Sequence, residues 1–461
     1  MTERVVVIGA DAAGMSAASQ ALRTARGHGR ALEIVALDRG HWTSYSACGI
    51  PYWVAGTVDG PDALVARTPA QHRANGIDIR LKTEAVHLDL ESRSVGYADR
   101  RTHAEGTLEF DQVVIATGAR PIRPDVPGVD ATGVHGVQTL DDGAALLQRL
   151  TARRLRRAVI VGGGYIGIEM AEAMVERGLA VTVVDRGAEP MPTLDPDLGR
   201  QVHEAMKAMG ISVETGTPVE AFEVGADGAV RGVVAGGRTL PADIVILGLG
   251  VEPATGLAEA AGLRLGEFGG LRVDDRMQVP GHEGVWAAGD CVESHDRIAE
   301  AWTYVPLGTH ANKQGRVLGT NLGGGAATFP GVVRTAISKV CNLEVARAGL
   351  GEADARAAGL RCVTATIEST TRAGYFPGTK PMTIKLIAED PSGRLLGAQI
   401  VGRSGSAKRI DALAIALWNG MTVSDLAMVD LAYAPPFSPV WDPVLIAART
   451  AADDLATDDC R

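Results

Sequence analysis

The sequence predicts an α/β fold, with two Rossmann-like domains followed by a smaller C-terminal α+β domain. Three observations lead to this fold class. The apolar residues form short Val/Ile/Ala runs, which is typical of buried parallel strands. Glycine is abundant, at 57 of 461 residues, and one pattern of strand, glycine turn, helix and strand occurs twice. The chain is also too long for one compact core, so we expect more than one domain.

The composition argues against several classes of protein. The net charge is −10, and no basic stripe suits nucleic acid. No run of about 18 uncharged apolar residues is long enough to span a membrane. The N-terminus has no signal-like segment, so we expect a cytoplasmic protein. The five cysteines lack the spacing of a metal site or a disulfide framework, so we expect no metal.

The first unit shows the pattern in the order strand, turn, helix and strand, at 4–8, 9–14, 15–26 and 33–37. Gly9 and Gly14 keep two glycines of the Gly-x-Gly-x-x-Gly motif, whereas Asp11 replaces the middle one. The second strand ends at Asp38, where a dinucleotide fold places an acid for a ribose diol. Small residues such as Ala13 let a pyrophosphate approach the free amides of the helix start.

The second unit repeats this order with a strand at 158–161, a turn at 162–167, a helix through Glu169 and Glu176, and a strand at 180–184. All three motif glycines, Gly162, Gly164 and Gly167, are present. Two such units predict two bound dinucleotides. Asp185 ends the second strand and favours NADH, because a carboxylate repels a 2′-phosphate; NADPH remains the alternative, since the adjacent Arg186 is able to tolerate that phosphate.

Further segments complete the pattern. Apolar strands closed by small residues follow the two units, at 110–119 and 242–250, and a strand at 284–290 ends in Gly-Asp. Polar–apolar alternation between 81 and 110 predicts an antiparallel meander. In the C-terminal region we expect strands at 363–369, 382–388 and 395–401, a hairpin turn at 390–393 and a helix at 408–418. We expect the acidic tail after Arg449 to be frayed.

These motifs, in this order, resemble the FAD-dependent pyridine nucleotide disulfide oxidoreductases over essentially the whole chain. The resemblance implies FAD in the first unit, NADH or NADPH in the second, and a C-terminal dimerisation domain. It assigns 1–150 and 251–327 to a discontinuous FAD-binding domain, 151–250 to an NAD(P)H-binding domain, 328–449 to the dimerisation domain and 450–461 to a flexible tail.

The resemblance also implies the cofactor-binding residues. Asp290 lies at the flavin side of FAD, Tyr165 gates the nicotinamide pocket, and Glu169 lies near the nicotinamide face of the flavin. No lysine follows Cys48 where two-cysteine members carry one to pair with that glutamate. The full expected set is Gly9, Ala13, Gly14, Asp38, Arg39, Ser44, Thr117, Gly118, Gly162, Gly164, Tyr165, Ile166, Gly167, Glu169, Asp185, Gly250, Gly289 and Asp290.

Cys48 lies on a Gly/Pro-bounded turn, a setting that suits an exposed thiolate. No Cys-x4-Cys pair is present, and the segment Ser44-x3-Cys48-Gly49-x-Pro51-Tyr52 is similar to the single-cysteine branch of the superfamily, that of coenzyme A disulfide reductase and its persulfide-reducing relatives. This similarity implies that Cys48 is the redox-active residue in the reduction of a small disulfide or persulfide, with coenzyme A as substrate or Cys48 adduct.

Gln20 and Arg23 match family positions near the coenzyme A site, as does Ser44, whereas Ala47 replaces the family's asparagine. Tyr375 and Tyr433 lie in motifs whose tyrosines reach the active cysteine of the partner subunit in the family. The resemblance therefore implies a homodimer with shared active sites, with Tyr433 as proton donor to a leaving thiolate and Tyr375 as a second polar contact. Interface packing is the alternative interpretation of these tyrosines.

Two other functions remain open. An NAD(P)H oxidase would reduce oxygen through a sulfenate at Cys48. Such relatives usually place a histidine in the first glycine loop, where this chain has Ala12. The other function is an electron-transfer reductase for a protein such as ferredoxin, in which Cys48 has no role.

Overall fold

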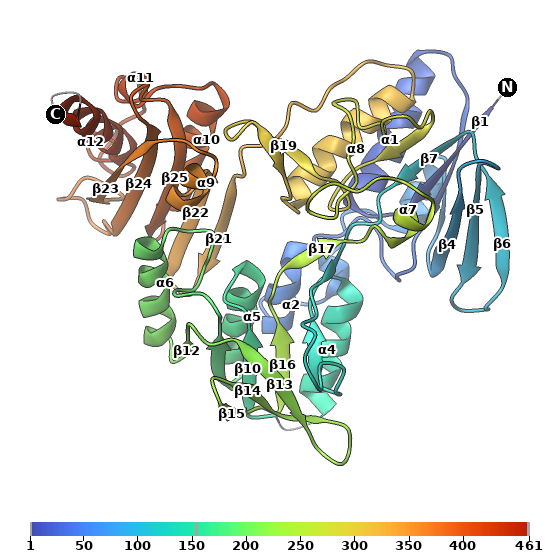
Figure 1. Ribbon diagram of the computed structural model, residues 1–461, viewed down its shortest axis with the longest axis horizontal. Coiled ribbons are helices and arrows are strands. Elements are labelled where there is room, and N and C mark those ends of the chain that lie inside the picture. The colour runs from blue at the N-terminus through green and yellow to red at the C-terminus, as the bar shows by residue number, and fades with distance from the viewer. Residues whose placement is uncertain (1, 153–154, 459–461) are drawn as a thin grey trace.

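The computed structural model describes residues 2–152 and 155–458. The chain forms three lobes (Figure 1). The first lobe contains the N-terminus. Its strands come partly from before and partly from after the segment of the chain that forms the second lobe. The third lobe contains the C-terminal helix. The predicted fold class, two parallel-sheet domains and a C-terminal α+β domain, is confirmed.

The first domain is built on a parallel sheet with the spatial order β18 (Val285–Ala287), β7 (Gln112–Ile115), β1 (Glu3–Ile8), β2 (Leu32–Leu37) and β3 (Ile77–Arg80). Val5, Val6 and Val7 are fully buried, because both faces of β1 are covered. The expected meander is present as β4 (Thr83–Asp89), β5 (Ser94–Asp99) and β6 (Glu105–Glu109).

Two helices far apart in sequence, α1 (Ala12–Gly27) and α8 (Gly308–Leu322), pack side by side in the first domain (Figure 1). The contact depends on glycine. A Cβ at Gly315 or Gly319 would lie 2.3 Å from the backbone oxygen of Ala13 or Ala17, respectively. The first glycine motif therefore begins a helix that is held in place by a segment about 300 residues later.

The second domain has the parallel strand order β12 (Ser212–Glu214), β11 (Ala180–Val184), β10 (Arg157–Val161), β16 (Ile244–Leu247) and β9 (Val134–Gly136). Its other elements are α5 (Tyr165–Glu176), α6 (Pro196–Ala208) and a small sheet of β13 (Val219–Val224), β14 (Val230–Ala235) and β15 (Arg238–Pro241). Because β9 pairs with β16, the chain enters this sheet before residue 150, the boundary that the sequence predicts.

Short elements join the two domains. Strands β8 (Ala119–Pro121) and β17 (Val251–Pro253) pair as an antiparallel ribbon. The two segments that follow the apolar strands at 110–119 and 242–250 therefore run side by side between the domains. Helix α2 (Ile50–Ala55), directly after Cys48, packs against α5 and against α4 (Leu140–Ala152) of the second domain. The remaining short elements are η1 (Ala47–Gly49), η2 (Pro61–Leu64), α3 (Pro69–Ala74), α7 (Gly256–Ala260), β19 (Ser294–Asp296) and β20 (Ala301–Thr303).

The third domain is an antiparallel sheet in the order β21 (Ala336–Val340), β22 (Leu343–Gly349), β25 (Leu395–Gly402), β24 (Pro381–Glu389) and β23 (Cys362–Thr370). Its helices are α9 (Glu352–Ala357), η3 (Ala407–Arg409), α10 (Ile410–Trp418), α11 (Val423–Leu426) and α12 (Pro443–Asp458). The tail differs from the expectation of a frayed segment. Helix α12 runs to Asp458 and buries Ala451 completely, whereas residues 459–461 lie outside the described residues.

Candidate active site

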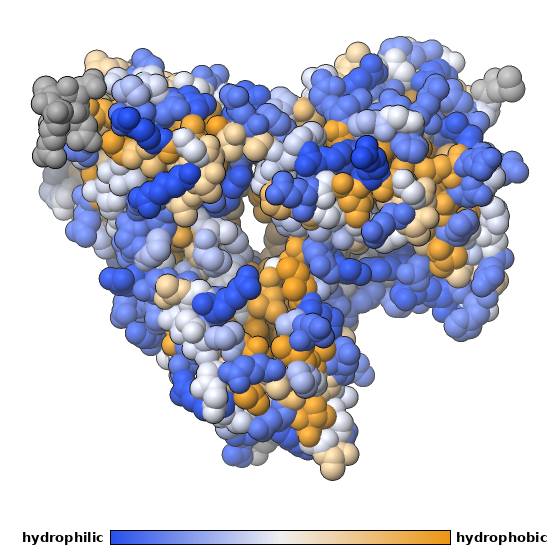
Figure 2. Space-filling view, in the orientation of Figure 1, coloured by the Kyte–Doolittle hydropathy of each residue, from blue (hydrophilic) through white to orange (hydrophobic). Residues whose placement is uncertain are grey.

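A cavity of about 3270 Å³ lies where the three domains meet, and Figure 2 shows the hollow from outside. Sites for one drug-sized ligand usually measure about 300–1,000 Å³. The cavity therefore has room for more than one large ligand. It is lined by the glycine turns of both parallel-sheet domains, by the Cys48 segment and by the start of β21.

The first glycine turn is shaped by two close contacts. A Cβ at Gly9, where φ is +99°, would lie 2.0 Å from the backbone oxygen of Ala116, and a Cβ at Gly14 would lie 1.9 Å from that of Gly9. The Asp38 carboxylate accepts hydrogen bonds from the amides of Ala10 and Gly40, at 2.8 and 2.7 Å. The turn thus presents backbone amides at the start of α1, beside an acid, as a dinucleotide requires.

The second glycine turn repeats this construction. A Cβ at Gly162, where φ is +102°, would lie 2.5 Å from the Gly248 oxygen, and one at Gly167 would lie 1.9 Å from the Gly162 oxygen. The Asp185 carboxylate accepts from the amides of Gly163 and Gly187, at 2.5 and 2.6 Å. Both turns therefore fit the adenosine and diphosphate parts of a dinucleotide.

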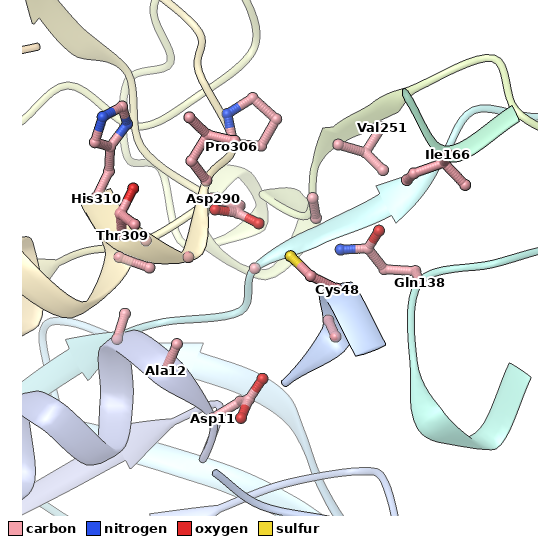
Figure 3. Close-up of a pocket in the computed structure, with 18 of the residues that line it drawn as sticks. Asp11, Ala12, Cys48, Gln138, Ile166, Val251, Asp290, Pro306, Thr309 and His310 are labelled. Carbon is pink, nitrogen blue, oxygen red and sulfur yellow. The ribbon is translucent and has the colours of Figure 1, made fainter. Parts of the chain in front are cut away.

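Two partly buried carboxyls face the cavity between these turns and the Cys48 segment (Figure 3). Burial raises the pKa of Asp11 to about 6, against the hydrogen bond that its Oδ1 accepts from the Tyr45 amide at 3.1 Å. Burial also raises the pKa of Asp290 to about 6. Both groups therefore favour the neutral form more than an ordinary aspartate does, which lowers the repulsion of a bound diphosphate.

Cys48 lies in η1 at the start of α2, and its thiol points into the cavity, with Asp290 on one side and Gln138 on the other (Figure 3). In the described part of the chain it is the cysteine that lines the cavity. Burial raises the pKa of the Cys48 thiol, and the nearby Glu169 carboxyl raises it further. A thiolate at this position therefore needs stabilisation from another group in the cavity.

Glu169 lines the same cavity from α5, one turn after Tyr165. Burial raises the pKa of Glu169, and its Oε1 accepts a hydrogen bond from the Ser338 hydroxyl at 2.7 Å. Tyr165 also lines the cavity beside Thr193, and burial raises the pKa of its hydroxyl. Among the described residues no cation pairs with Glu169 in place of the lysine that the sequence lacks after Cys48, and a hydroxyl from the third domain contacts the glutamate instead.

Ser44 lines the cavity in a left-handed backbone conformation, with φ at +48°. Its Oγ lies 2.9 Å from Nε2 of His72, which is buried on α3. A second cavity of about 600 Å³ adjoins this corner and shares Arg23 and Arg67 with the first. Arg26 also lines it, and among the described residues no acidic side chain does. Three guanidinium groups around one cavity suit a ligand with several phosphates.

The structure brings together most of the residues predicted from the sequence. The following line the large cavity: Gly9, Ala13, Asp38, Arg39, Ser44, Cys48, Thr117, Gly118, Gly162, Gly164, Tyr165, Ile166, Glu169, Asp185, Gly250, Gly289, Asp290 and Arg23. Gly14 and Gly167 shape the turns from behind. Gln20 lines neither cavity; its Oε1 accepts from Arg23 at 2.8 Å, so it orients that arginine.

Tyr375 and Tyr433 do not line the cavity of their own chain. Their exposed fractions are 77% and 45%, and a side-chain hydrogen bond with Tyr375 is the main cause that raises the pKa of Tyr433. Other large apolar side chains of the third domain are also exposed, namely Ile415, Trp418, Met428, Phe437, Val440 and Trp441. A single chain therefore leaves the two tyrosines and an apolar surface uncovered.

Several residues at the site were not singled out from the sequence, namely Arg67, His72, Gln138 and Ser338. Each comes from a segment with no motif of its own. Among residues 2–152 and 155–458 no cluster of histidine, cysteine and carboxylate side chains could hold a metal ion. No helix in these residues is long and apolar enough to cross a membrane.

Comparisons with known proteins agree with this geometry. The family model for the pyridine nucleotide-disulphide oxidoreductases matches residues 3–315, and the model for their dimerisation domain matches residues 335–443. An NADH oxidase of Methanocaldococcus jannaschii is 35% identical over 457 residues, which cover 98% of this chain and 99% of that protein.

Two sulfur-reducing proteins are similarly close. The NAD(P)H coenzyme A polysulfide/persulfide reductase of Pyrococcus horikoshii is 36% identical over 453 residues, covering 97% of this chain and 98% of that protein. The structure of an NAD-dependent persulfide reductase from A. fulgidus superposes with a TM-score of 0.93 at 38% identity, covering 98% of this chain and 84% of that one.

Proposed function

Because the chain belongs to the pyridine nucleotide-disulphide oxidoreductase family, we propose that it uses FAD and NAD(P)H to reduce a small disulfide or persulfide, most simply coenzyme A disulfide, at Cys48. The observation that carries the proposal is the position of the Cys48 thiol, in a cavity lined by two dinucleotide-type turns and joined to a cavity with three arginines.

The residues present fit the two cofactors. The first turn, with Gly9, Asp38 and Arg39, would hold the adenosine and diphosphate of FAD, and Asp290 would face the flavin. The second turn, with Gly162 and Asp185, would hold the nicotinamide dinucleotide. When bound, FAD supplies two-electron transfer from NAD(P)H to a disulfide bond. Asp185 supports NADH, because a carboxylate at the end of this strand repels a 2′-phosphate.

Cys48 would act as the nucleophile. Its thiolate attacks one sulfur of the substrate disulfide, forms a mixed disulfide and releases the other half as a thiolate. Two electrons and one proton then cleave the mixed disulfide, which returns the Cys48 thiolate and releases the second half as a thiol. Because no second cysteine lines the cavity in the described residues, the mixed disulfide stays with the substrate's own thiol.

The arginine cavity supports coenzyme A as the substrate. Coenzyme A carries three phosphates, and Arg23, Arg26 and Arg67 surround the adjoining cavity without an acidic neighbour. Ser44 lines the large cavity four residues before Cys48, and its backbone carbonyl accepts a hydrogen bond from the amide of Ala66, which lines both cavities. A ligand with its phosphates among the arginines would therefore extend toward the thiol.

The matched dimerisation domain and the exposed apolar side chains of the third domain support a homodimer. In that assembly the tyrosines of one subunit would reach the Cys48 site of the other. Tyr433 would donate the proton to a leaving thiolate, and Tyr375 would orient Tyr433 through their hydrogen bond.

The deciding experiment is anaerobic titration of the purified protein with NADH, followed by turnover with coenzyme A disulfide and with polysulfide. We expect disulfide turnover in the wild type and its loss in Cys48→Ser, while flavin reduction by NADH persists in both. Unchanged disulfide turnover in Cys48→Ser would contradict the proposal. Mass analysis of the Cys48 peptide tests for a coenzyme A adduct in the purified protein.

A second candidate is oxygen reduction, which the name of the M. jannaschii relative favours. In this case Cys48 would cycle through a sulfenate. Ala12 lines the cavity at the position in the first glycine loop where such relatives usually have a histidine. A sulfenate at Cys48 would therefore lack that partner. Rapid oxygen consumption with NADH, together with inert disulfides, would favour the oxidase. Rapid ferredoxin reduction in Cys48→Ser would favour electron transfer.

A further inference from the structure

Helix α5 carries two glutamates one turn apart, Glu169 and Glu172, and both are contacted by the edge strand β21 of the third domain. Glu172 is paired with the ammonium group of Lys339, and its Oε2 accepts from the Cys341 amide at 2.9 Å. Glu169 accepts from Ser338 at 2.7 Å. Two adjacent residues of β21 thus contact different carboxyls. The Lys339 ammonium group pairs with Glu172, and the Ser338 hydroxyl donates to Glu169.

This division leaves Glu169 without a cation. In the part of the chain that the structure describes, no lysine, arginine or histidine forms an ion pair with it. The carboxyl lines the cavity that contains Cys48 and contributes to the electrostatic environment of the thiol. The hydroxyl of Ser338 therefore determines how this carboxyl is oriented and how readily it is charged.

We propose that Ser338 is a positioning residue that holds the Glu169 carboxyl toward Cys48 and keeps it charged, in place of a lysine partner. The proposal rests on the proposed function for the role of Cys48 as the reacting thiol. It assigns a functional contact to the dimerisation domain within a single subunit, in addition to the contacts expected across the dimer.

The charged and titratable groups around Glu169 are few. They are Glu172 on the same helix, Tyr165 one turn before, Cys48 and Tyr52 from the η1–α2 segment and Lys339 from β21. A hydroxyl that donates to a carboxylate stabilises its charged form. Loss of the Ser338 hydroxyl therefore frees the Glu169 carboxyl to turn away from Cys48 or to take up a proton. Either change reduces the negative charge beside the thiol and makes it easier to ionise.

The test measures Cys48 alkylation in the absence of substrate. The holoenzyme is reduced, desalted under nitrogen and treated with iodoacetamide between pH 5 and 10, and the Cys48 peptide is quantified by mass spectrometry. We expect Ser338→Ala to shift the alkylation midpoint about half a pH unit lower, which corresponds to about threefold faster alkylation at neutral pH. Ser338→Thr keeps a hydroxyl and should restore the wild-type profile.

A double-mutant cycle separates this role from a structural one. Glu169→Gln removes the charge altogether, so we expect it to shift the midpoint in the same direction and Ser338→Ala to add nothing in the double variant. The matched control is Ser392→Ala, which removes a Ser–Glu hydrogen bond of the same length, 2.7 Å to Glu389, in the exposed turn between β24 and β25. It should leave the profile unchanged.

The outcomes are distinguishable from those of the proposed function. A wild-type profile in Ser338→Ala, or shifts that add in the double variant, would overturn the inference while disulfide turnover through Cys48 stands. Absence of disulfide turnover in the wild type, together with the expected alkylation shifts, would overturn the proposed function and leave the Ser338–Glu169 relationship in place.

Discussion

Oγ of Ser44 lies 2.9 Å from Nε2 of His72, and the other ring nitrogen of His72 is buried without a partner in the part of the chain that the structure describes. Burial lowers the pKa of His72, so the ring is neutral near pH 7. A buried N–H without an acceptor is costly, which favours the tautomer in which Nε2 donates to Ser44 and Nδ1 carries no proton. The hydrogen of the Ser44 hydroxyl is then free for a ligand acceptor, such as a phosphate oxygen.

Replacement of His72 should therefore weaken substrate binding. In His72→Phe we expect the KM for coenzyme A disulfide to rise about threefold to tenfold, the range of one lost hydrogen bond, with the KM for NADH unchanged. Steady-state kinetics with each substrate varied in turn checks this. His87, an exposed residue of strand β4, is the control histidine, and His87→Phe should behave as wild type. A rise confined to the KM for NADH would contradict the role assigned to Ser44.

Arg67 should recognise phosphate and not the thiol end of the substrate. In Arg67→Gln we expect the KM for coenzyme A disulfide to rise about tenfold, because one charge-assisted contact is lost. Turnover of pantethine, a disulfide without the nucleotide phosphates, should not change. Arg264→Gln, at an exposed position away from both cavities, is the control. Equal losses with both disulfides would show that Arg67 acts in another way.

Asp185 should set the preference for NADH. Substitution by serine removes the carboxylate that repels a 2′-phosphate, so the ratio of kcat/KM for NADH over NADPH should fall by about tenfold or more. The carboxylate also accepts from Gly163 and Gly187, so the melting temperature is measured alongside. Arg186→Gln is the opposing variant and should reduce any turnover with NADPH. An unchanged ratio in Asp185→Ser would contradict the assignment.

Asp11 should make the flavin-free protein less stable as the pH rises. Its folded pKa of about 6 lies above the ordinary value of 3.8, so the folded state binds the extra proton between these values. This contribution to stability is complete below about pH 4 and is lost as the pH rises through 6. Asp11→Asn should therefore be more stable than the wild type above pH 6, by about 2 kcal/mol, and equal to it near pH 4.

Thermal unfolding of both flavin-free proteins between pH 4 and 8 checks this prediction. The asparagine keeps an oxygen for the Tyr45 amide, so the comparison isolates the charge. A constant difference between variant and wild type across this range would show that the proton on Asp11 is not the cause.

Local sequence patterns were sufficient for most of the strands. Strand β11 has the bounds that the apolar run at 180–184 predicts, since a buried parallel strand requires continuous apolar residues. Strand β9 escaped prediction, because its three residues gain their structure from pairing with β16, about 110 residues later. Helix α12 was not predicted, because the acidic residues after Arg449 are typical of an exposed tail. The alanines at 447, 448 and 451 nevertheless form a buried face of this helix.

The candidate site divides in the same way. The glycine turns, Asp38 and Asp185 are predictable because one local pattern contains the whole binding unit. The contact of Ser338 with Glu169 joins residues 169 positions apart, and Ser44 meets His72 only because of how α3 is placed. Such pairs have no signature in a single sequence, since neither residue lies in a motif with the other.

The packing of α1 against α8 also sets an order of events during synthesis. The second domain has all its parallel strands once residue 247 has left the ribosome. The first domain still lacks β18 and the glycine face of Gly315 and Gly319 at that moment. At translation rates of about 5–20 residues per second, some 75 further residues take several seconds. The strands of the middle domain are therefore all synthesised first. The N-terminal strands can complete their sheet only after β18 and α8 have been synthesised.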